Sequence, residues 1–349
     1  MGEVSTIGVD IAKSVFQIHG VDANGAVVIR KRVGRAKFLE FFAKLPPCLV
    51  GMEACATAHH WARELKKLGH DTRLMPPTYV KAYVKRGKND ATDAAATCEA
   101  VTRPSMRLVP IKSVEQQSAL MLHRTRDLLI RQRTQLINAL RAHLAELGLV
   151  AAKGPEGLQQ LVAAVTANSD ERLPSNARFA YQSIVAQLHA AQTQINGLDK
   201  RITQTHRANV DSKRLEAIPG FGVILSTAVV ATMADPKAFR TGREFAAWIG
   251  LVPRQNSTGG KEHLGSISKQ GDRYLRRLLV LGAISIVRTA RMRPEKYPWV
   301  IELLARRPAK VVAVALANKM ARTAWAVLAR GETYRPPMRS SSTAIAAAA

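Results

Sequence analysis

The chain has 349 residues, 47% of them hydrophobic, so it is long enough for two or three packed domains and too apolar for wholesale disorder. It carries 52 lysines and arginines against 26 aspartates and glutamates, a net charge of +26, which favours a nucleic-acid-binding protein. The longest apolar stretch, residues 221–234, is too short to cross a bilayer, which argues against a membrane protein.

Residues 1–110 alternate between strand-like and helix-like segments. The expected strands cover residues 7–10, 14–20, 26–33, 48–53 and 71–75. Asn24-Gly25 joins the second strand to the third as a hairpin turn. Helices are expected at 36–44 and 57–68, the second with Thr57 as its N-cap. This order predicts an α/β domain with a mixed sheet.

Four carboxylates stand out in this domain. Asp10 and Glu53 each end a buried strand, where a carboxylate is costly unless it is paired, hydrogen-bonded or bound to a metal. Asp90 and Asp93 lie three residues apart on an alanine-rich helix, after the basic stretch 81–88. A turn aspartate at position 10 and a capping box at 90–93 are the structural alternatives. Together the four acids offer oxygen ligands for Mg²⁺, and two such ions can activate one oxygen and stabilise another at a phosphodiester.

Residues 111–213 are helical, with long helices expected at 114–147 and 176–207. Apolar residues on the second helix alternate spacings of three and four, at Tyr181, Ile184, Leu188, Ala191, Ile195, Leu198 and Ile202. That is the pattern of a coiled-coil seam. The seam belongs either to a dimerisation arm or to an intramolecular helical hairpin. In both cases we expect a spacer and assembly element without catalytic residues.

Residues 214–335 are expected to form a helical domain, and 336–349 a disordered tail. Gly220 and Gly222 precede a helix at 223–233 and resemble the hairpin of a helix-hairpin-helix element, in which glycines let the backbone approach a phosphate. Any tight interhelical turn would give the same pattern. Asp272 is the expected N-cap of a helix that runs to residue 291.

A glycine-rich segment of the third domain places Ser257 among cations. The candidate nucleic-acid contacts there are Arg254, Lys261, Lys269, Arg273, Arg276 and Arg277. A serine hydroxyl ringed by positive charge suits attack on a phosphodiester. A flexible phosphate-binding loop is the alternative reading, because neither His263 nor another nearby residue is a compelling general base.

Two sets of residues carry a family resemblance. Asp10, Glu53, Asp90 and Asp93 resemble the DEDD set of a RuvC-like, ribonuclease-H-type nuclease domain. The C-terminal motifs are Gly-Leu-Val-Pro at 250–253, Asn-Ser-Thr-Gly-Gly-Lys at 256–261 and Ile-Ser-Lys-Gln-Gly-Asp-Arg-Tyr-Leu-Arg at 267–276. Over nearly its whole length the chain therefore resembles the bacterial insertion-sequence transposases of the IS-one-ten/IS-eleven-eleven family.

The resemblance implies a DNA transposase in which the four acids bind Mg²⁺ or Mn²⁺ and Ser257 is the nucleophile, with Thr258 as the neighbouring hydroxyl. It further implies double-stranded DNA, a structured guide RNA and a homodimer or tetramer as partners, in the bacterial cytoplasm. We add Lys13, Gly220 and Gly222 to the expected nucleic-acid contacts. A metal-dependent junction resolvase and a non-catalytic nucleic-acid scaffold are the alternatives.

Overall fold

A computed structural model describes residues 3–84, 89–167 and 172–336 of the chain. The chain forms two compact units, one of residues 1–117 and 233–240, the other of residues 118–232 and 241–349. Part of the basic stretch (85–88) and the predicted disordered tail from 337 lie outside the described residues. The sequence-based division at residues 110 and 213 stays a prediction.

The first unit is built on a five-stranded mixed sheet of strand order β3-β2-β1-β4-β5. Its strands are β1 (Thr6–Ile11), β2 (Val15–Val21), β3 (Val27–Gly34), β4 (Leu49–Glu53) and β5 (Asp71–Met75). The first three are antiparallel neighbours, and β4 and β5 run parallel to β1. The predicted mixed α/β domain is confirmed.

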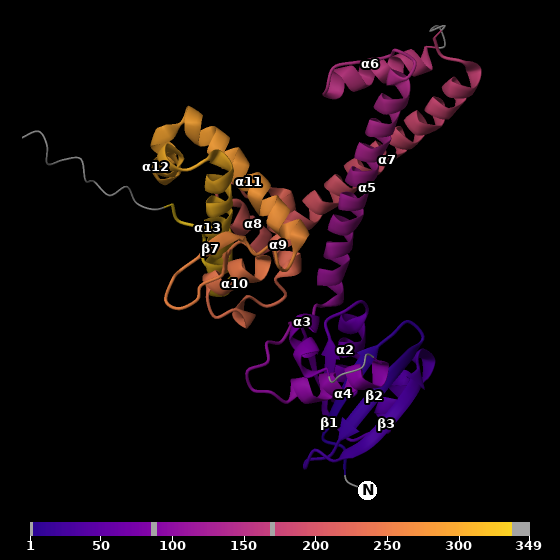
Figure 1. Cartoon of the computed structure of the whole chain (residues 1–349), viewed down its shortest axis with the longest axis vertical. Helices are drawn as coiled ribbons and strands as arrows, with labels where there is room; N and C mark the ends of the chain where they lie inside the picture. The colour runs from indigo at the N-terminus through magenta and orange to yellow at the C-terminus, as the bar shows by residue number, and fades with distance from the viewer. Residues whose placement is uncertain (1–2, 85–88, 168–171, 337–349) are drawn as a thin grey trace, which may run out of the picture. The chain divides into compact units, whose positions relative to one another are not determined.

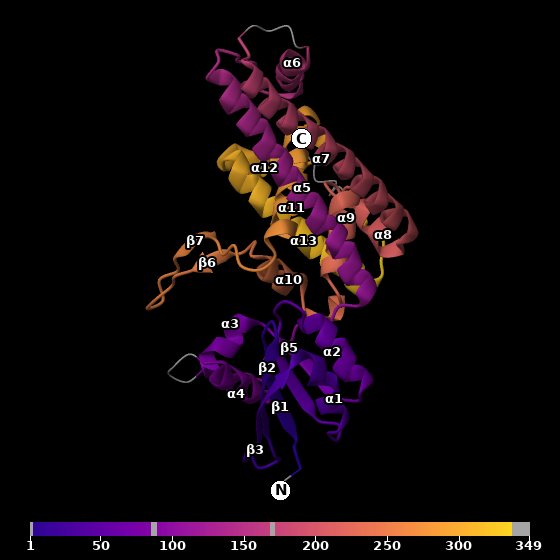
Figure 2. The same ribbon diagram turned by 90° about the vertical axis from the view of Figure 1, so that its right-hand side faces the viewer.

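Helices cover both faces of this sheet (Figure 2). They are η1 (Arg35–Lys37), α1 (Phe38–Ala43), α2 (Ala58–Lys67), α3 (Pro77–Val80), η2 (Lys81–Tyr83) and α4 (Asp90–Val101), and η3 (Pro236–Ala238) belongs to the same unit. Alternate strand residues point to opposite faces. One face buries Phe16 against Phe38 and Trp61 of the α1–α2 layer. The other face is covered by α4.

Two glycines let α4 lie directly on the sheet. A Cβ at Gly51 would lie 2.7 Å from Cβ of Val101, and a Cβ at Gly8 would collide with the backbone of Ala94 and Cys98. Gly8 and Gly51 are paired across β1 and β4. Because side chains alternate along a strand, the residues two positions further on, Asp10 and Glu53, belong to the same face.

The second unit includes a long helical hairpin (Figure 1). It consists of α5 (Val114–Ala145, in this unit from residue 118) and α7 (Ser175–Ala208), with α6 (Pro155–Thr166) at the closed end. The heptad-spaced residues of α7 are buried within the single chain, namely Tyr181, Leu188, Ile195 and Ile202. Arg133 of α5 donates to Gln192 of α7. The seam therefore serves an intramolecular hairpin, which was the alternative to a dimerisation arm.

The rest of the second unit is a helical domain that carries one β-hairpin. Its elements are α8 (Val210–Glu216), α9 (Val223–Thr232), α10 (Gly242–Ile249), β6 (Pro253–Gln255), β7 (Leu264–Ile267), α11 (Arg273–Met292), η4 (Pro294–Lys296), α12 (Pro298–Arg306) and α13 (Ala309–Arg330). By length and composition α13 could cross a membrane. Its Val312, Ala317 and Met320 are buried, and it packs on α10 and α11 as a core helix.

Local signals in the sequence had mixed outcomes. Asp272 caps α11 as predicted, because its carboxylate accepts the backbone N–H of Leu275 at 2.8 Å. Thr57 precedes α2 as predicted, but its left-handed backbone (φ 70°) leaves its side chain without a capping bond. Gly220 (φ 85°) packs against Gly282 of α11, where a Cβ would meet the Gly282 carbonyl at 3.0 Å. Gly220 thus has a packing role, and its phosphate contact stays a prediction.

Candidate active site

Two of the four predicted acids sit at one edge of the sheet. Asp10 ends β1 and Glu53 ends β4, and the preceding residues Val9 and Met52 are paired in the parallel ladder. The carboxyl ends of parallel strands meet at the same edge, so the two carboxylates are neighbours. Both are half-buried.

The other two acids are on the first turns of α4, which is held by a capping box. Asn89 Oδ1 accepts the backbone N–H of Thr92 at 2.8 Å, and Thr92 Oγ1 accepts the N–H of Asn89 at 3.3 Å. Asn89 and Thr92 therefore form the cap, and the capping interpretation of Asp90 and Asp93 is wrong. Negative charge in a first helical turn is also favoured by the helix dipole.

Three of the acids converge. Carboxylate oxygens of Asp10, Asp90 and Asp93 all lie within 4.8 Å of one another. Burial raises the pKa of Asp10, and the charges of Asp90 and Asp93 raise it further. Burial also raises the pKa of Glu53, with added repulsion from Asp10 and Asp93. Such crowding of like charge is unfavourable unless a cation lies among the carboxylates.

The donor set fits a hard divalent cation. Its ligating atoms are carboxylate oxygens, the type that Mg²⁺ prefers. The sequence predicts that Cys48, Cys55 and Cys98 are reduced core thiols, but Cys55, two residues after Glu53, is exposed. Burial and the Glu53 charge raise the pKa of the Cys55 thiol, and Mg²⁺ prefers oxygen to sulfur ligands. The site therefore remains an oxygen site.

Ser257 lies in a β-hairpin of the second unit. β6 and β7 are antiparallel, and their connection ends in a tight turn in which Thr258 and Lys261 exchange backbone hydrogen bonds of 3.3 and 3.0 Å. Gly259 (φ 55°) and Gly260 (φ 76°) supply the two positive φ angles of that turn. The loop that the sequence indicated as flexible is thus a defined hairpin.

The Ser257 hydroxyl is exposed and oriented by the main chain. Its Oγ accepts the backbone N–H of His263 at 3.2 Å. His263 contributes its backbone to this contact. The position of Ser257 suits a group that reacts with a ligand outside the protein.

The predicted cations near Ser257 fall into two groups. Arg254, Lys261, Lys269 and Arg273 are exposed, and Arg254 also donates from Nη2 to the Ser268 carbonyl at 3.3 Å. Arg276 instead donates from Nη1 to the carbonyls of Ile249 and Gln270, at 2.7 and 2.6 Å.

Arg277 forms an ion pair with Asp127. Arg276 and Arg277 therefore have structural partners, which the sequence pattern did not indicate. In the first unit, Lys13 is exposed after β1, and its carbonyl accepts from Arg35 at 3.3 Å.

A buried polar pair in the second unit also escaped the sequence analysis. His123 of α5 and Tyr274 of α11 are joined by a 3.1 Å hydrogen bond between Nδ1 and the phenolic oxygen. Tyr274 belongs to the Gly-Asp-Arg-Tyr motif, which could have drawn attention to it. His123 lies 151 residues away and carries no sequence signal.

The fold and the acid cluster define a class of protein, a DNA-processing enzyme with a DEDD-type acidic domain joined to a helical domain. Comparisons with known proteins give the family. Residues 7–148 match a DEDD-type family described as a transposase, and residues 212–298 match the family described as "Transposase IS116/IS110/IS902 family".

Full-length relatives agree with these matches. A Pseudomonas aeruginosa protein described as a family 20 transposase is 49% identical over 335 residues, which are 95% of this chain and 99% of the relative. The transposase for insertion sequence element IS1111A of Coxiella burnetii is 40% identical over 96% of this chain and 92% of its own length. The transposase for IS1328 of Yersinia enterocolitica is 38% identical over 96% and 99%.

The chain belongs to the IS110/IS116/IS902 family of insertion-sequence transposases. It is therefore an enzyme of DNA strand cleavage and strand transfer. The DEDD family and the aspartate cluster together indicate the use of a divalent metal ion.

Proposed function

We propose that this transposase cuts and rejoins DNA with Ser257 as the nucleophile and with Mg²⁺ held by its DEDD acids. The observation that carries the metal site is the convergence of Asp10, Asp90 and Asp93 in a chain of net charge +26. Three carboxylates oppose the binding of DNA unless a cation offsets them. Asp10, Asp90 and Asp93 would hold the ion, and Glu53 would complete the set. A bound divalent cation supplies positive charge that stabilises phosphoryl oxygens during strand cleavage.

Ser257 would carry the covalent step. An Oγ–P bond forms, a P–O bond of the DNA backbone breaks, the serine proton leaves to solvent and the departing sugar oxygen takes up a proton. The phosphoserine ester keeps the energy of the broken phosphodiester, which rejoining to a new end then uses. Arg254, Lys261 and Arg273 are exposed in the same domain as Ser257 and would hold the negatively charged phosphates.

We further propose a structured guide RNA and self-association. The high positive charge would bind the RNA backbone, while base pairing would choose the DNA sequence. The hairpin of α5 and α7 is the proposed element of self-association. Both proposals come from the family resemblance and the charge of the chain.

The test is a search for a covalent protein–DNA adduct. The purified chain is mixed with a labelled four-way DNA junction, the transcript encoded beside the gene and Mg²⁺, and is then denatured. We expect an adduct with the wild type that Ser257→Ala abolishes while DNA binding is retained. Thr258→Ala is the matched control and should still form it. Cleavage of normal yield by Ser257→Ala would show that water is the nucleophile, as in a plain metal-dependent nuclease.

A further inference from the structure

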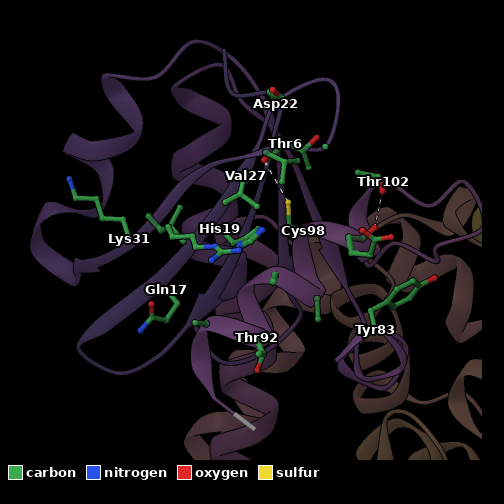
Figure 3. Close-up of a pocket in the computed structure, with 18 of the residues that line it drawn as sticks. Thr6, Gln17, His19, Asp22, Val27, Lys31, Tyr83, Thr92, Cys98 and Thr102 are labelled. Atoms are coloured by element: carbon green, nitrogen blue, oxygen red, sulfur yellow. Dashed lines mark hydrogen bonds between the residues drawn. The ribbon is translucent and has the colours of Figure 1, made fainter. Parts of the chain in front are cut away.

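We propose that a groove between α4 and the β2–β3 hairpin binds phosphates of the DNA strand on one side of the cleavage point. The inference rests on the proposed function of the acid cluster and extends it to substrate positioning. The groove belongs to the first unit, has a volume of about 950 Å³ and is lined by β2, β3 and α4. Figure 3 shows Gln17 and His19 on the sheet and Thr92 on α4.

The strand register connects the acid cluster to the groove. Asp10 is paired with Gln17 of β2, and Gln17 is paired with Arg32 of β3. Directly opposed residues of neighbouring strands project on the same face. Asp10, Gln17 and Arg32 therefore form a row across three strands that begins at the proposed metal site.

A second row runs beside the first. Gly8, His19 and Arg30 are paired in the same way, and α4 lies over Gly8. Arg30 and Arg32 are both exposed, and both line the groove. The far side of the groove thus carries two guanidinium groups, which bind phosphate oxygens well because of their planar donor geometry.

The residue between these arginines points the other way. Lys31 is paired with Ile18, which is 2% exposed in the core against α1 and α2. The Lys31 ammonium lies 5.5 Å from the ring centroid of Phe41 on α1. Figure 3 shows its amino group directed away from Gln17 and His19. Lys31 also contributes to the lining of the groove, but its ammonium lies over Phe41 and not beside Gln17 and His19, so it offers a control of equal charge on the same strand.

The two acids that line the groove, Asp22 and Glu99, already have partners within the protein. Asp22 Oδ1 accepts the backbone N–H groups of Asn24 and Ala26 at 2.9 Å each. Glu99 forms an ion pair with Arg103. Arg103 offsets the charge of Glu99, and Asp22 is held in a turn, so Arg30 and Arg32 give the sheet side of the groove a net positive charge.

The dimensions suit a nucleic-acid strand. Neighbouring strands lie about 4.8 Å apart, so the row from Asp10 to Arg32 is about 10 Å long. Phosphates of one B-DNA strand repeat at about 3.4 Å along the axis. A strand with its reacting phosphate at the acid cluster would bring a nearby phosphate of the same strand to Arg32. The partner is DNA because the row starts at the acids of a DNA-cleaving enzyme.

The test compares two double variants of the full chain, Arg30→Gln with Arg32→Gln and Lys31→Gln with Lys66→Gln. Lys66 is exposed on α2, so the second pair removes the same charge from the other side of the sheet. Binding to a labelled DNA duplex is measured against salt concentration without Mg²⁺. We expect the groove variant to lower the slope of log K against log salt by about 1.8, since each lost duplex phosphate contact contributes about 0.9. The control should keep the wild-type slope.

Crosslinking gives a second measurement that tolerates a loss of stability. A photoreactive residue at position 32 should crosslink to DNA, and one at position 31 should not. Equal slopes for both double variants, or crosslinks from position 31 alone, would overturn the inference. A slope change with an RNA duplex and none with DNA would overturn the assignment to DNA. None of these readouts needs strand cleavage, so a failed adduct test would count against the proposed function alone.

Discussion

His123 on α5 and Tyr274 on α11 share a hydrogen bond of 3.1 Å that is shielded from solvent, since His123 is only 1% exposed. Burial and the nearby Arg126 lower the pKa of His123 to about 4. Burial raises the pKa of Tyr274 to about 12. Both side chains are therefore neutral near pH 7, and an uncharged Nδ1 can accept the phenolic proton. This bond fixes the Ser257-bearing domain to the helical hairpin within the second unit.

The first prediction concerns the pH dependence of stability. Unfolded His123 binds a proton near pH 6.5, whereas folded His123 binds it only near pH 4. The contribution of neutral His123 to the unfolding free energy is therefore complete above pH 6.5 and is lost as the pH falls towards 4. The loss should be on the order of 3 kcal/mol. Thermal unfolding of the full chain by tryptophan fluorescence measures it, because Trp248, Trp299 and Trp325 report on the second unit. His123→Gln should flatten this dependence, and a slope unchanged in that variant would refute the assignment.

The second prediction concerns the contact of α4 with the sheet. Gly8→Ala places a methyl group against the backbone of Ala94 and Cys98, which cannot move aside as a side chain can. We expect a loss of about 1–3 kcal/mol in unfolding free energy, and a loss of DNA cleavage because Asp93 shifts with the helix. Gly34→Ala is the control, since an added Cβ there meets no atom within 4 Å. Chemical denaturation measures the unfolding free energy of both variants, and a cleavage assay measures their activity. Equal losses in Gly8→Ala and Gly34→Ala would contradict this prediction.

The third prediction concerns the repulsion among the acids. Asp93→Asn removes one like charge, so without Mg²⁺ the first unit should be at least as stable as in the wild type. Added Mg²⁺ should raise the melting temperature of the wild type and leave that of the variant nearly unchanged. Asp22→Asn is the control, because Asp22 stabilises a turn through Asn24 and Ala26 and should keep the Mg²⁺ response. An equal Mg²⁺ response in Asp93→Asn would exclude this site.

The same cluster predicts a pH effect on metal binding. The raised pKa values of Asp10 and Glu53 mean that the folded state holds protons more tightly than the unfolded state, so metal-free stability falls as the pH rises from about 4. A metal ion must displace those protons. Stabilisation by Mg²⁺ should therefore be smaller at pH 5 than at pH 8, which a melting series at both values measures.

The fourth prediction separates binding cations from structural ones. Lys261→Gln with Arg273→Gln should weaken DNA binding and lower the salt slope by about 1.8, because both residues are exposed in the domain that carries Ser257. Arg276→Gln should instead cost about 1–3 kcal/mol of stability, because it leaves the carbonyls of Ile249 and Gln270 without their donor. Anisotropy titrations and denaturation of both variants test this. The reverse pattern would place Arg276 at the nucleic acid.

The fifth prediction concerns self-association. A groove of about 530 Å³ runs along α5 and α7, lined by Leu129, Leu136, Ala191 and several glutamines. Leu136→Glu with Ala191→Glu should lower the oligomeric mass in sedimentation if a second copy packs there. Leu128→Glu, at an exposed α5 residue outside this groove, should leave the mass unchanged. Changes at Leu188 or Ile195 would damage the hairpin itself, since both are buried within one chain.

The sequence by itself determined the five strands of the first unit, the long helices and the positions of the four acids, but not the β6–β7 hairpin. These depend on local patterns: Asn24-Gly25 joins two strands, and Asp10 and Glu53 follow apolar runs that can only be buried strands. The motif around Ser257 and the order of the acids also carried the family resemblance, because both are short and fixed along the chain. The cap of α11 at Asp272 was predictable for the same reason.

Only the tertiary structure decided which partner each long-range residue meets. The close contact of α4 with Gly8 depends on how the helix packs on the sheet. The hydrogen bond from Arg276 to the Gln270 carbonyl depends on the conformation of the loop before α11. The pairing of His123 with Tyr274 joins residues 151 apart, which no periodicity encodes. Whether the α7 seam faces a second chain or α5 was likewise open, because an apolar stripe requires burial but does not specify its partner.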